Sequence, residues 1–94
     1  MEKHIVYVIA CKSPNHFYVG YSREFDKRMK THKRKGGAMF TKIHGFDKVI
    51  FTKEVSSIEE AKKLENKLTF ELIEKYGSDN VAGAGHTTVN KKIK

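Results

Sequence analysis

The sequence is poor in several features, and each absence excludes a class of protein or site. Of its 94 residues, one is cysteine, one is proline and none is tryptophan. With Cys11 as the lone cysteine, neither an intramolecular disulfide nor a cysteine-based zinc site is available, and a reducing compartment suits the chain. No apolar run approaches the roughly 20 residues of a membrane-spanning helix, and the first residues lack the regions of a secretory signal. We therefore expect one soluble intracellular domain, cytoplasmic or nuclear, over residues 1–94.

Acidic residues are scarce relative to basic ones. The chain has 19 lysines and arginines against 11 acidic residues, which gives a net charge of +8 and a pI near 9.6. A run of charge usually marks only a solvated face, but a pI above 9 with tyrosines nearby favours contact with nucleic acid. Most of the surplus falls in one segment, which contains Arg23, Lys27, Arg28, Lys30, Lys33, Arg34 and Lys35.

Two short segments that each carry a tyrosine read as a β-hairpin. His4–Cys11 is rich in β-branched residues and too short to favour a helix, so it is predicted to be a strand buried on both faces. Residues 12–16 have turn chemistry, and Phe17–Tyr21 returns as the second strand. The period of two along each strand allows Tyr7 and Tyr18 to face the same way.

A basic helix follows the hairpin. Ser22 is the predicted N-cap, the helix runs through Arg34, and Gly36 and Gly37 terminate it. Arg28 and His32 fall in the same arc of this helix as its two large apolar residues, so the guanidinium and the imidazole share the flank that packs on the sheet. Residues 36–45 are predicted to be a loop.

The second half of the chain reads as a strand and a longer helix. Lys48–Val55 is the predicted third strand. Ser57 and Glu60 form a capping box at a helix start, and the helix is expected to run over Ile58–Tyr76 and end at Gly77. The tail from residue 78 to 94 looks irregular.

Glu65 falls within the apolar arc of the helix 58–76. A carboxylate on a core-facing arc must be paired, metal-bound or protonated, because uncompensated desolvation costs several kcal/mol. A salt bridge to Arg28 or to a lysine and a divalent cation are both open. One carboxylate suits Mg²⁺, which keeps several waters and takes its other ligands from substrate phosphate. Zinc and a two-metal clamp need more ligands than the spacing supplies.

Arg28 can stabilise charge that grows on a phosphoryl group. Half-buried tyrosines on strands are usually core residues with a bonded hydroxyl. Beside Arg28 and His32, however, Tyr7 and Tyr18 become candidates for orienting or deprotonating a water.

The order of these residues resembles the GIY-YIG nuclease family, over the stretch from about His4 to Asn90. The resemblance is carried by motif positions that occur in the family's order, namely Val6-Tyr7, Tyr18-Val19-Gly20, Arg28 and His32 four residues apart, and Glu65 on the capped helix. It implies an α+β fold of β-β-α-β-α order, a three-stranded antiparallel sheet with flanking helices, and cleavage of phosphodiester bonds in DNA, as in repair or recombination.

By position, the resemblance also implies a role for each residue. Glu65 would hold one divalent metal, Mg²⁺ or Mn²⁺, and Arg28 would stabilise the pentacoordinate phosphate. Tyr7 and Tyr18 would position or deprotonate the attacking water, and His32 would tune a tyrosine or touch phosphate. Further contacts with DNA are expected from Gly20, Arg23, Lys27, Lys30, Lys33, Arg34, Lys35, Lys42 and Asn80.

The chain departs from the family pattern in two ways. Ile5 stands where the first motif has its glycine, which adds bulk beside Tyr7. We expect no accessory DNA-binding module of the kind that many members attach, so selectivity would come from substrate shape, from a homodimer or from an accessory protein. Two other hypotheses stay open: a nucleic-acid-binding module without turnover, and a basic domain that recognises an acidic partner.

Overall fold

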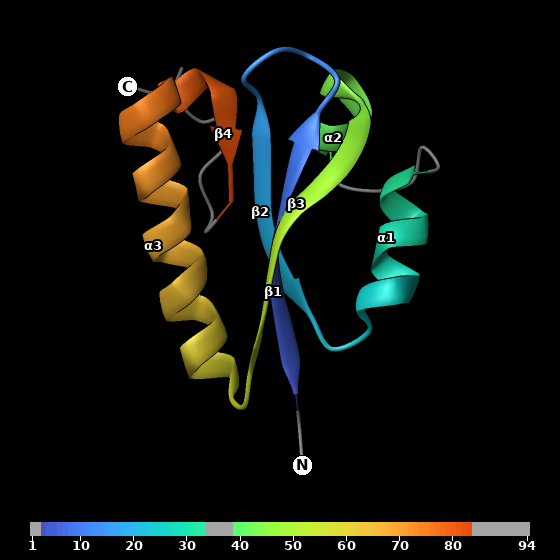
Figure 1. Ribbon diagram of the computed structural model, residues 1–94, viewed down its shortest axis with the longest axis vertical. Helices are drawn as coiled ribbons and strands as arrows, with labels where there is room; N and C mark the ends of the chain where they lie inside the picture. Colours follow the sequence, from blue (N-terminus) through green and yellow to red (C-terminus); the bar gives the residue numbers. More distant parts are fainter. Residues whose placement is uncertain (1–2, 34–38, 84–94) are drawn as a thin grey trace.

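The computed structural model describes residues 3–33 and 39–83, which form an α+β fold around one mixed sheet (Figure 1). The strands are ordered β3-β1-β2-β4 across the sheet. In chain order the elements are β1 (His4–Cys11), β2 (Phe17–Ser22), α1 (Phe25–Lys33), α2 (Met39–His44), β3 (Phe46–Val55), α3 (Ile58–Tyr76), the 3-10 turn η1 (Ser78–Asn80) and β4 (Val81–Ala82).

The predicted hairpin is present, and its register places the tyrosines. β1 and β2 pair antiparallel with Tyr7 opposite Gly20 and Ile9 opposite Tyr18. Since side chains alternate between faces, Tyr7, Ile9 and Tyr18 lie on one face of the sheet. The turn contains Asn15 with a φ of 60°, a left-handed conformation that asparagine tolerates. The prediction that the two phenols face the same way is confirmed.

The predicted three-stranded antiparallel sheet is wrong, because a fourth strand makes the sheet mixed. β4 pairs parallel with β2, with Val81 beside Phe17 and Ala82 beside Tyr18. Val81 and Ala82 are 0% and 1% exposed, so burial against β2 and α3 holds this strand in place. A strand of two residues has too few positions to show a period of two, and the tail therefore looked irregular.

The first helix begins later than predicted. β2 extends to Ser22, whose Oγ accepts a hydrogen bond from the amide of Glu24 at 2.9 Å. The amide of Arg28 donates to the carbonyl of Glu24 at 3.0 Å, so Glu24, not Ser22, precedes the first turn of α1. The predicted end of this helix at Arg34 and Gly36–Gly37 lies outside the described residues.

The loop predicted over residues 36–45 is wrong in its second half, where α2 forms. Phe40 and Thr41 are 6% and 2% exposed, and Phe40 packs against Cys11 and Ala82. A six-residue helix is too short to be stable alone, so these tertiary contacts account for it. β3 then begins at Phe46, two residues before the predicted Lys48.

The prediction for α3 is confirmed at both ends. Ser57 Oγ accepts from the amide of Glu60 at 3.1 Å, and Gly77 has a φ of 99° with its amide bonded to the carbonyl of Ile73. The capping box differs in one detail. The Glu60 carboxylate accepts from the amide of Ser56 at 3.1 Å, one residue earlier than the motif predicts.

The two longer helices lie on opposite sides of the sheet (Figure 1). Beneath α1, Met29 packs with Tyr7 and Ile9. On the other side, Val8 and the α3 residues Leu68 and Leu72 line a common hollow. No helix in the described ranges combines the length and apolar character that crossing a membrane requires. A side chain on α3 therefore comes close to the residues beneath α1 where it extends past an edge of the sheet.

Candidate active site

Arg28 joins the two phenols. Its guanidinium lies near both Tyr7 and Tyr18, and hydrogen bonding and positive charge from Arg28 act to lower the pKa of each phenol. The two rings lie 6.5 Å apart between centroids. Burial raises the pKa of Tyr7 to about 12 and also raises the pKa of Tyr18, while Arg28 opposes both shifts. Both phenols are therefore protonated at neutral pH. The predicted cluster of two phenols and a guanidinium is present in the structure.

His32 lies behind Tyr7 and is only 3% exposed. Its Nε2 is 3.3 Å from the Tyr7 hydroxyl, and its Nδ1 is 3.1 Å from Thr41 Oγ1. Burial, with a further contribution from Arg28, lowers the pKa of His32 to about 4. The imidazole is therefore neutral at physiological pH and uses both nitrogens inside the protein. Of the two roles predicted for His32, tuning a tyrosine fits this environment, whereas contact with phosphate does not.

The lowered pKa of His32 predicts a pH dependence of stability. Between about pH 6.5, its ordinary value, and about pH 4, the unfolded chain binds a proton that the folded protein does not. The free energy of unfolding should fall as the pH drops through this window, by on the order of 3 kcal/mol from this group. Urea unfolding of the wild type and His32→Gln at both ends of the window measures it. Parallel pH curves for the two proteins would contradict the assignment.

Gly20 gives the two phenols their space. A Cβ at this buried position would lie 2.7 Å from the Tyr7 hydroxyl oxygen and 3.1 Å from Tyr18 Cε2, both closer than unstrained contact allows. The sequence assigned Gly20 to contact with DNA. In the structure it lies directly opposite Tyr7 in the sheet, where the absence of a side chain sets the position of the phenol.

Gly20→Ala should therefore displace Tyr7 from Arg28 and His32. We expect a loss of roughly 1–3 kcal/mol of stability from overpacking, together with a change in the environment of Tyr7. Gly77→Ala is the control for lost stability without crowding of the phenols. Its φ of 99° strains any side chain, but nothing except its chain neighbours lies nearer than 4.0 Å to its Cβ position. Tyrosine NMR shifts measure the difference. Unchanged Tyr7 signals in Gly20→Ala would show that the site does not depend on this spacing.

Glu65 approaches the phenols from the other helix. It is half-buried on α3, and its charge raises the pKa of both Tyr7 and Tyr18. Thr69, one turn later, donates to the Glu65 carbonyl at 2.7 Å, and its Oγ1 lies against Gly83, which also lies against Val19 of β2. Glu65 therefore stands beside the β2 edge, where a side chain from α3 can act on groups under α1.

The donor set of the site suits one loosely held divalent ion better than a closed metal cage. Among the described residues, no cluster of three or more histidine, cysteine, aspartate or glutamate side chains could hold a metal. Glu65 is a single carboxylate beside two phenols. Such a set fits Mg²⁺ or Mn²⁺, which would complete their shells with water and phosphate oxygens.

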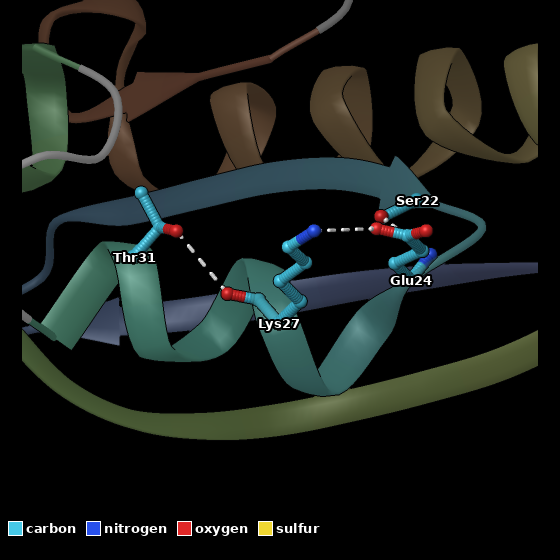
Figure 2. A network of polar contacts seen from close by, with 4 residues as sticks. All are labelled: Ser22, Glu24, Lys27 and Thr31. Atoms are coloured by element: carbon cyan, nitrogen blue, oxygen red, sulfur yellow. Dashed lines mark hydrogen bonds and ion pairs between the residues drawn. The ribbon is translucent and has the colours of Figure 1, made fainter.

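A shallow hollow of about 310 Å³ opens beside α1 and is lined by Ser22, Glu24, Lys27, Arg28 and Thr31. Figure 2 shows Lys27 extended toward Glu24, with Nζ 3.6 Å from the carboxylate, and Thr31 one turn further along. This ion pair is exposed on both sides, so it contributes little energy and Lys27 can exchange its partner for a phosphate. Because Arg28 lines the hollow and also bonds the phenols, the hollow is the open approach to the site.

The other described residues predicted to contact DNA are exposed, namely Arg23, Lys30, Lys33 and Lys42. Of these, Lys33 has its Nζ 5.8 Å from the centre of the Phe46 ring, on the β3 side of α1. Arg34 and Lys35 lie outside the described residues.

The prediction for Asn80 looks different in the structure. Asn80 Nδ2 donates to the carbonyl of Tyr76, and Tyr76 is about 16 Å along α3 from Glu65 at 1.5 Å per residue. Asn80 therefore belongs to the end of the helix.

Ile5 lies on the face of β1 that carries Tyr7, because the two residues are two apart in the strand. It stands opposite Ser22 and lines a hollow with Phe25, at the start of α1. The bulk that the sequence predicted beside Tyr7 is therefore on that side of the sheet.

Sequence reasoning missed Thr41. Its hydroxyl contacts His32 from α2, in a segment that the sequence presented as a loop. A threonine in a short apolar stretch carries no periodic signal, so only the tertiary structure could identify it.

Comparison with known proteins gives a consistent result. A family model described as the GIY-YIG catalytic domain matches residues 3–78. The UPF0213 protein YazA of Bacillus subtilis is 38% identical over 78 residues, which cover 80% of this chain and 78% of that protein. UPF0213 proteins of Staphylococcus haemolyticus and Staphylococcus saprophyticus are 34% and 31% identical over 68 residues, covering 72% of this chain and 82% of theirs. No solved structure matches the chain significantly.

Proposed function

Because the chain belongs to the GIY-YIG nuclease family, we propose that it is an endonuclease that hydrolyses phosphodiester bonds in DNA with one divalent metal ion. The observation that carries the proposal is the convergence of groups from both sides of the sheet. Arg28 hydrogen-bonds both Tyr7 and Tyr18, and Glu65 acts on the same two phenols. Phosphoryl transfer is catalysed mainly by positioning and charge stabilisation, which such a cluster supplies.

Arg28 would bind the scissile phosphate. A guanidinium has five donors in a fixed fork, so it can keep its bonds to the phenols and still donate to a phosphate oxygen from the hollow. The charge on the phosphate grows during attack by water, and a preorganised donor at that point stabilises the transition state more than the ground state.

Tyr7 would orient the attacking water rather than deprotonate it. Its pKa is about 12 and that of His32 about 4. Passing the Tyr7 proton to His32 is therefore uphill by on the order of 10 kcal/mol, at about 1.4 kcal/mol per pKa unit. Tyr7 keeps its proton and offers an oxygen lone pair. Tyr18, the more exposed phenol, would be the better placed of the two to lose its own proton to solvent beside a bound divalent ion, and the resulting phenolate would then accept the proton of the attacking water.

Glu65 would hold the metal, with Mg²⁺ or Mn²⁺ as the ion. A divalent ion bound there would neutralise charge on the phosphate and favour the ionised forms of nearby water and phenol. Glu65 lies on α3 and Arg28 on α1, and both act on the same two phenols, so the substrate phosphate would be held between the carboxylate and Arg28.

The basic flank of α1 would grip the neighbouring phosphates. Arg23, Lys27 and Lys30 are exposed there, and Lys42 is exposed on α2. Contacts of this kind position a protein on DNA without reading its sequence. Selectivity would then come from the shape of the substrate, from a homodimer or from an accessory DNA-binding protein.

The proposal is tested by nicking of supercoiled plasmid, and of a panel of linear, flapped and branched DNA, with Mg²⁺, with Mn²⁺ and with chelator. Cleavage that needs the metal supports it. Salt-dependent DNA binding without cleavage under every condition would favour a binding module on the same fold.

A further inference from the structure

Thr41 is a buried hydroxyl whose placement suggests a role in the site. It lies on α2, is 2% exposed, and has its Oγ1 3.1 Å from His32 Nδ1. The other nitrogen of the same ring faces Tyr7. Thr41, His32 and Tyr7 thus form a chain that leads from the interior to Arg28 and the open hollow.

The direction of each hydrogen bond along this chain follows from counting protons. Arginine only donates, so an Arg28 guanidinium that hydrogen-bonds Tyr7 uses a lone pair of the phenol oxygen. The phenol hydrogen then points away from the guanidinium, and His32 Nε2, 3.3 Å from the hydroxyl, accepts it when that nitrogen carries no proton. An Nε2 that accepts carries no proton, so the neutral ring carries its proton on Nδ1 and donates it to Thr41 Oγ1.

We propose that Thr41 is a positioning residue that fixes His32 as its Nδ1-protonated tautomer and thereby turns the Tyr7 hydroxyl away from the substrate. The phenol oxygen then presents its lone pairs to Arg28 and to the attacking water. Thr41 touches neither substrate nor metal and acts only through His32. This role in the reaction rests on the proposed nuclease function, whereas the tautomer is a property of the free protein.

The alternative arrangement shows what Thr41 prevents. If His32 carried its proton on Nε2, it would donate to the Tyr7 oxygen, and Arg28 would donate to the same atom. The Tyr7 hydrogen would then point into the site and occupy the direction from which water is to be held. A ring that is 3% exposed has no bulk solvent to accept a proton from Nδ1, so the Nδ1–H tautomer needs the Thr41 oxygen as its acceptor.

The test compares Thr41→Val, which removes the acceptor at nearly constant shape, with Thr41→Ser, which keeps it. Thr52→Val is the control for the same exchange at another neighbour of Tyr7, because Thr52 is exposed on β3 directly opposite Tyr7 and shows whether any hydroxyl lost near the phenol has the same effect. Couplings between ring protons and nitrogens in ¹⁵N NMR spectra report the His32 tautomer in the free protein, and His32→Gln assigns the signals. We expect Nδ1–H in the wild type, Thr41→Ser and Thr52→Val, and Nε2–H in Thr41→Val.

The same proteins are compared in plasmid nicking. Loss of a residue that orients a functional histidine costs roughly tenfold or more, so Thr41→Val should slow cleavage by that factor while Thr41→Ser stays close to the wild type. A wild-type ring protonated on Nε2, or one that Thr41→Val leaves unchanged, overturns the tautomer assignment. A changed tautomer with an unchanged cleavage rate overturns the role in the reaction. A wild type that never cleaves DNA overturns the nuclease proposal instead, and the NMR comparison still decides the assignment.

Discussion

Arg28→Lys is expected to lower the rate of DNA cleavage by a factor on the order of 10²–10³, the usual effect of removing one preorganised donor to a developing oxyanion. The substitution keeps the positive charge but replaces a planar fork with a single ammonium. Arg28 bonds two phenols at once, and an ammonium on a flexible stem cannot hold that geometry and bind a phosphate oxygen as well. Single-turnover nicking at saturating metal and saturating protein measures the chemical step apart from binding.

Lys27→Arg is the control for Arg28→Lys. It makes the opposite substitution, lysine to arginine, at the neighbouring position of the same helix. Lys27 is exposed, and in the part of the chain that the structure describes it forms an ion pair with Glu24 at 3.6 Å. Replacing its ammonium with a guanidinium should therefore leave the single-turnover rate within about twofold. Cleavage by Arg28→Lys at the wild-type rate would show that only the charge at this position matters, and the proposed bridge between the phenols would be wrong.

The hairpin and α3 could be predicted because their signals are local. Alternation along β1 and β2, together with a short turn, is enough to place Tyr7 and Tyr18 on one face. The capping hydroxyl of Ser57 and the left-handed Gly77 mark the ends of α3 to the residue. The wheel position of Glu65 predicted a carboxylate near the core, and the structure finds it half-buried at the β2 edge.

The missed parts depend on contacts between segments distant in the chain. β4 is two residues long and exists because Val81 and Ala82 are buried beside β2. α2 forms because Phe40 packs on Cys11. Neither contact has a period or a cap that the sequence could display. The contact of Thr41 with His32 could not be predicted for the same reason, because it depends on how α2 packs in the folded protein.

The space around the phenols was likewise not predictable from the motif alone. The sequence presented Gly20 as a residue that contacts DNA. Its position opposite Tyr7 becomes clear only when the register of β1 and β2 is known. The same register places Ile5 opposite Ser22, on the face of β1 that carries Tyr7, so the isoleucine that stands for the motif glycine adds its bulk near the start of α1.

Glu65→Gln should abolish metal-dependent cleavage, with a loss on the order of 10³-fold or more, because the amide keeps the shape of the side chain but not the charge that holds a divalent ion. The loss should be accompanied by a second, independent change. Glu65 raises the pKa of Tyr7 and Tyr18, so removing its charge should let both phenols ionise at lower pH in the free protein. Ultraviolet titration of the tyrosines measures this without DNA or metal.

Glu71→Gln is the control for Glu65→Gln, because Glu71 lies on the exposed part of the same helix and has no contribution to the pKa of either phenol. It should leave both the titration and the cleavage rate unchanged. The two readouts separate two ways in which the proposal can fail. If Glu65→Gln shifts the titration but cleaves DNA at the wild-type rate, the carboxylate is near the phenols without holding the metal. If it shifts neither, Glu65 does not belong to the site, and Arg28 with the two phenols would have to bind phosphate without a carboxylate partner from α3.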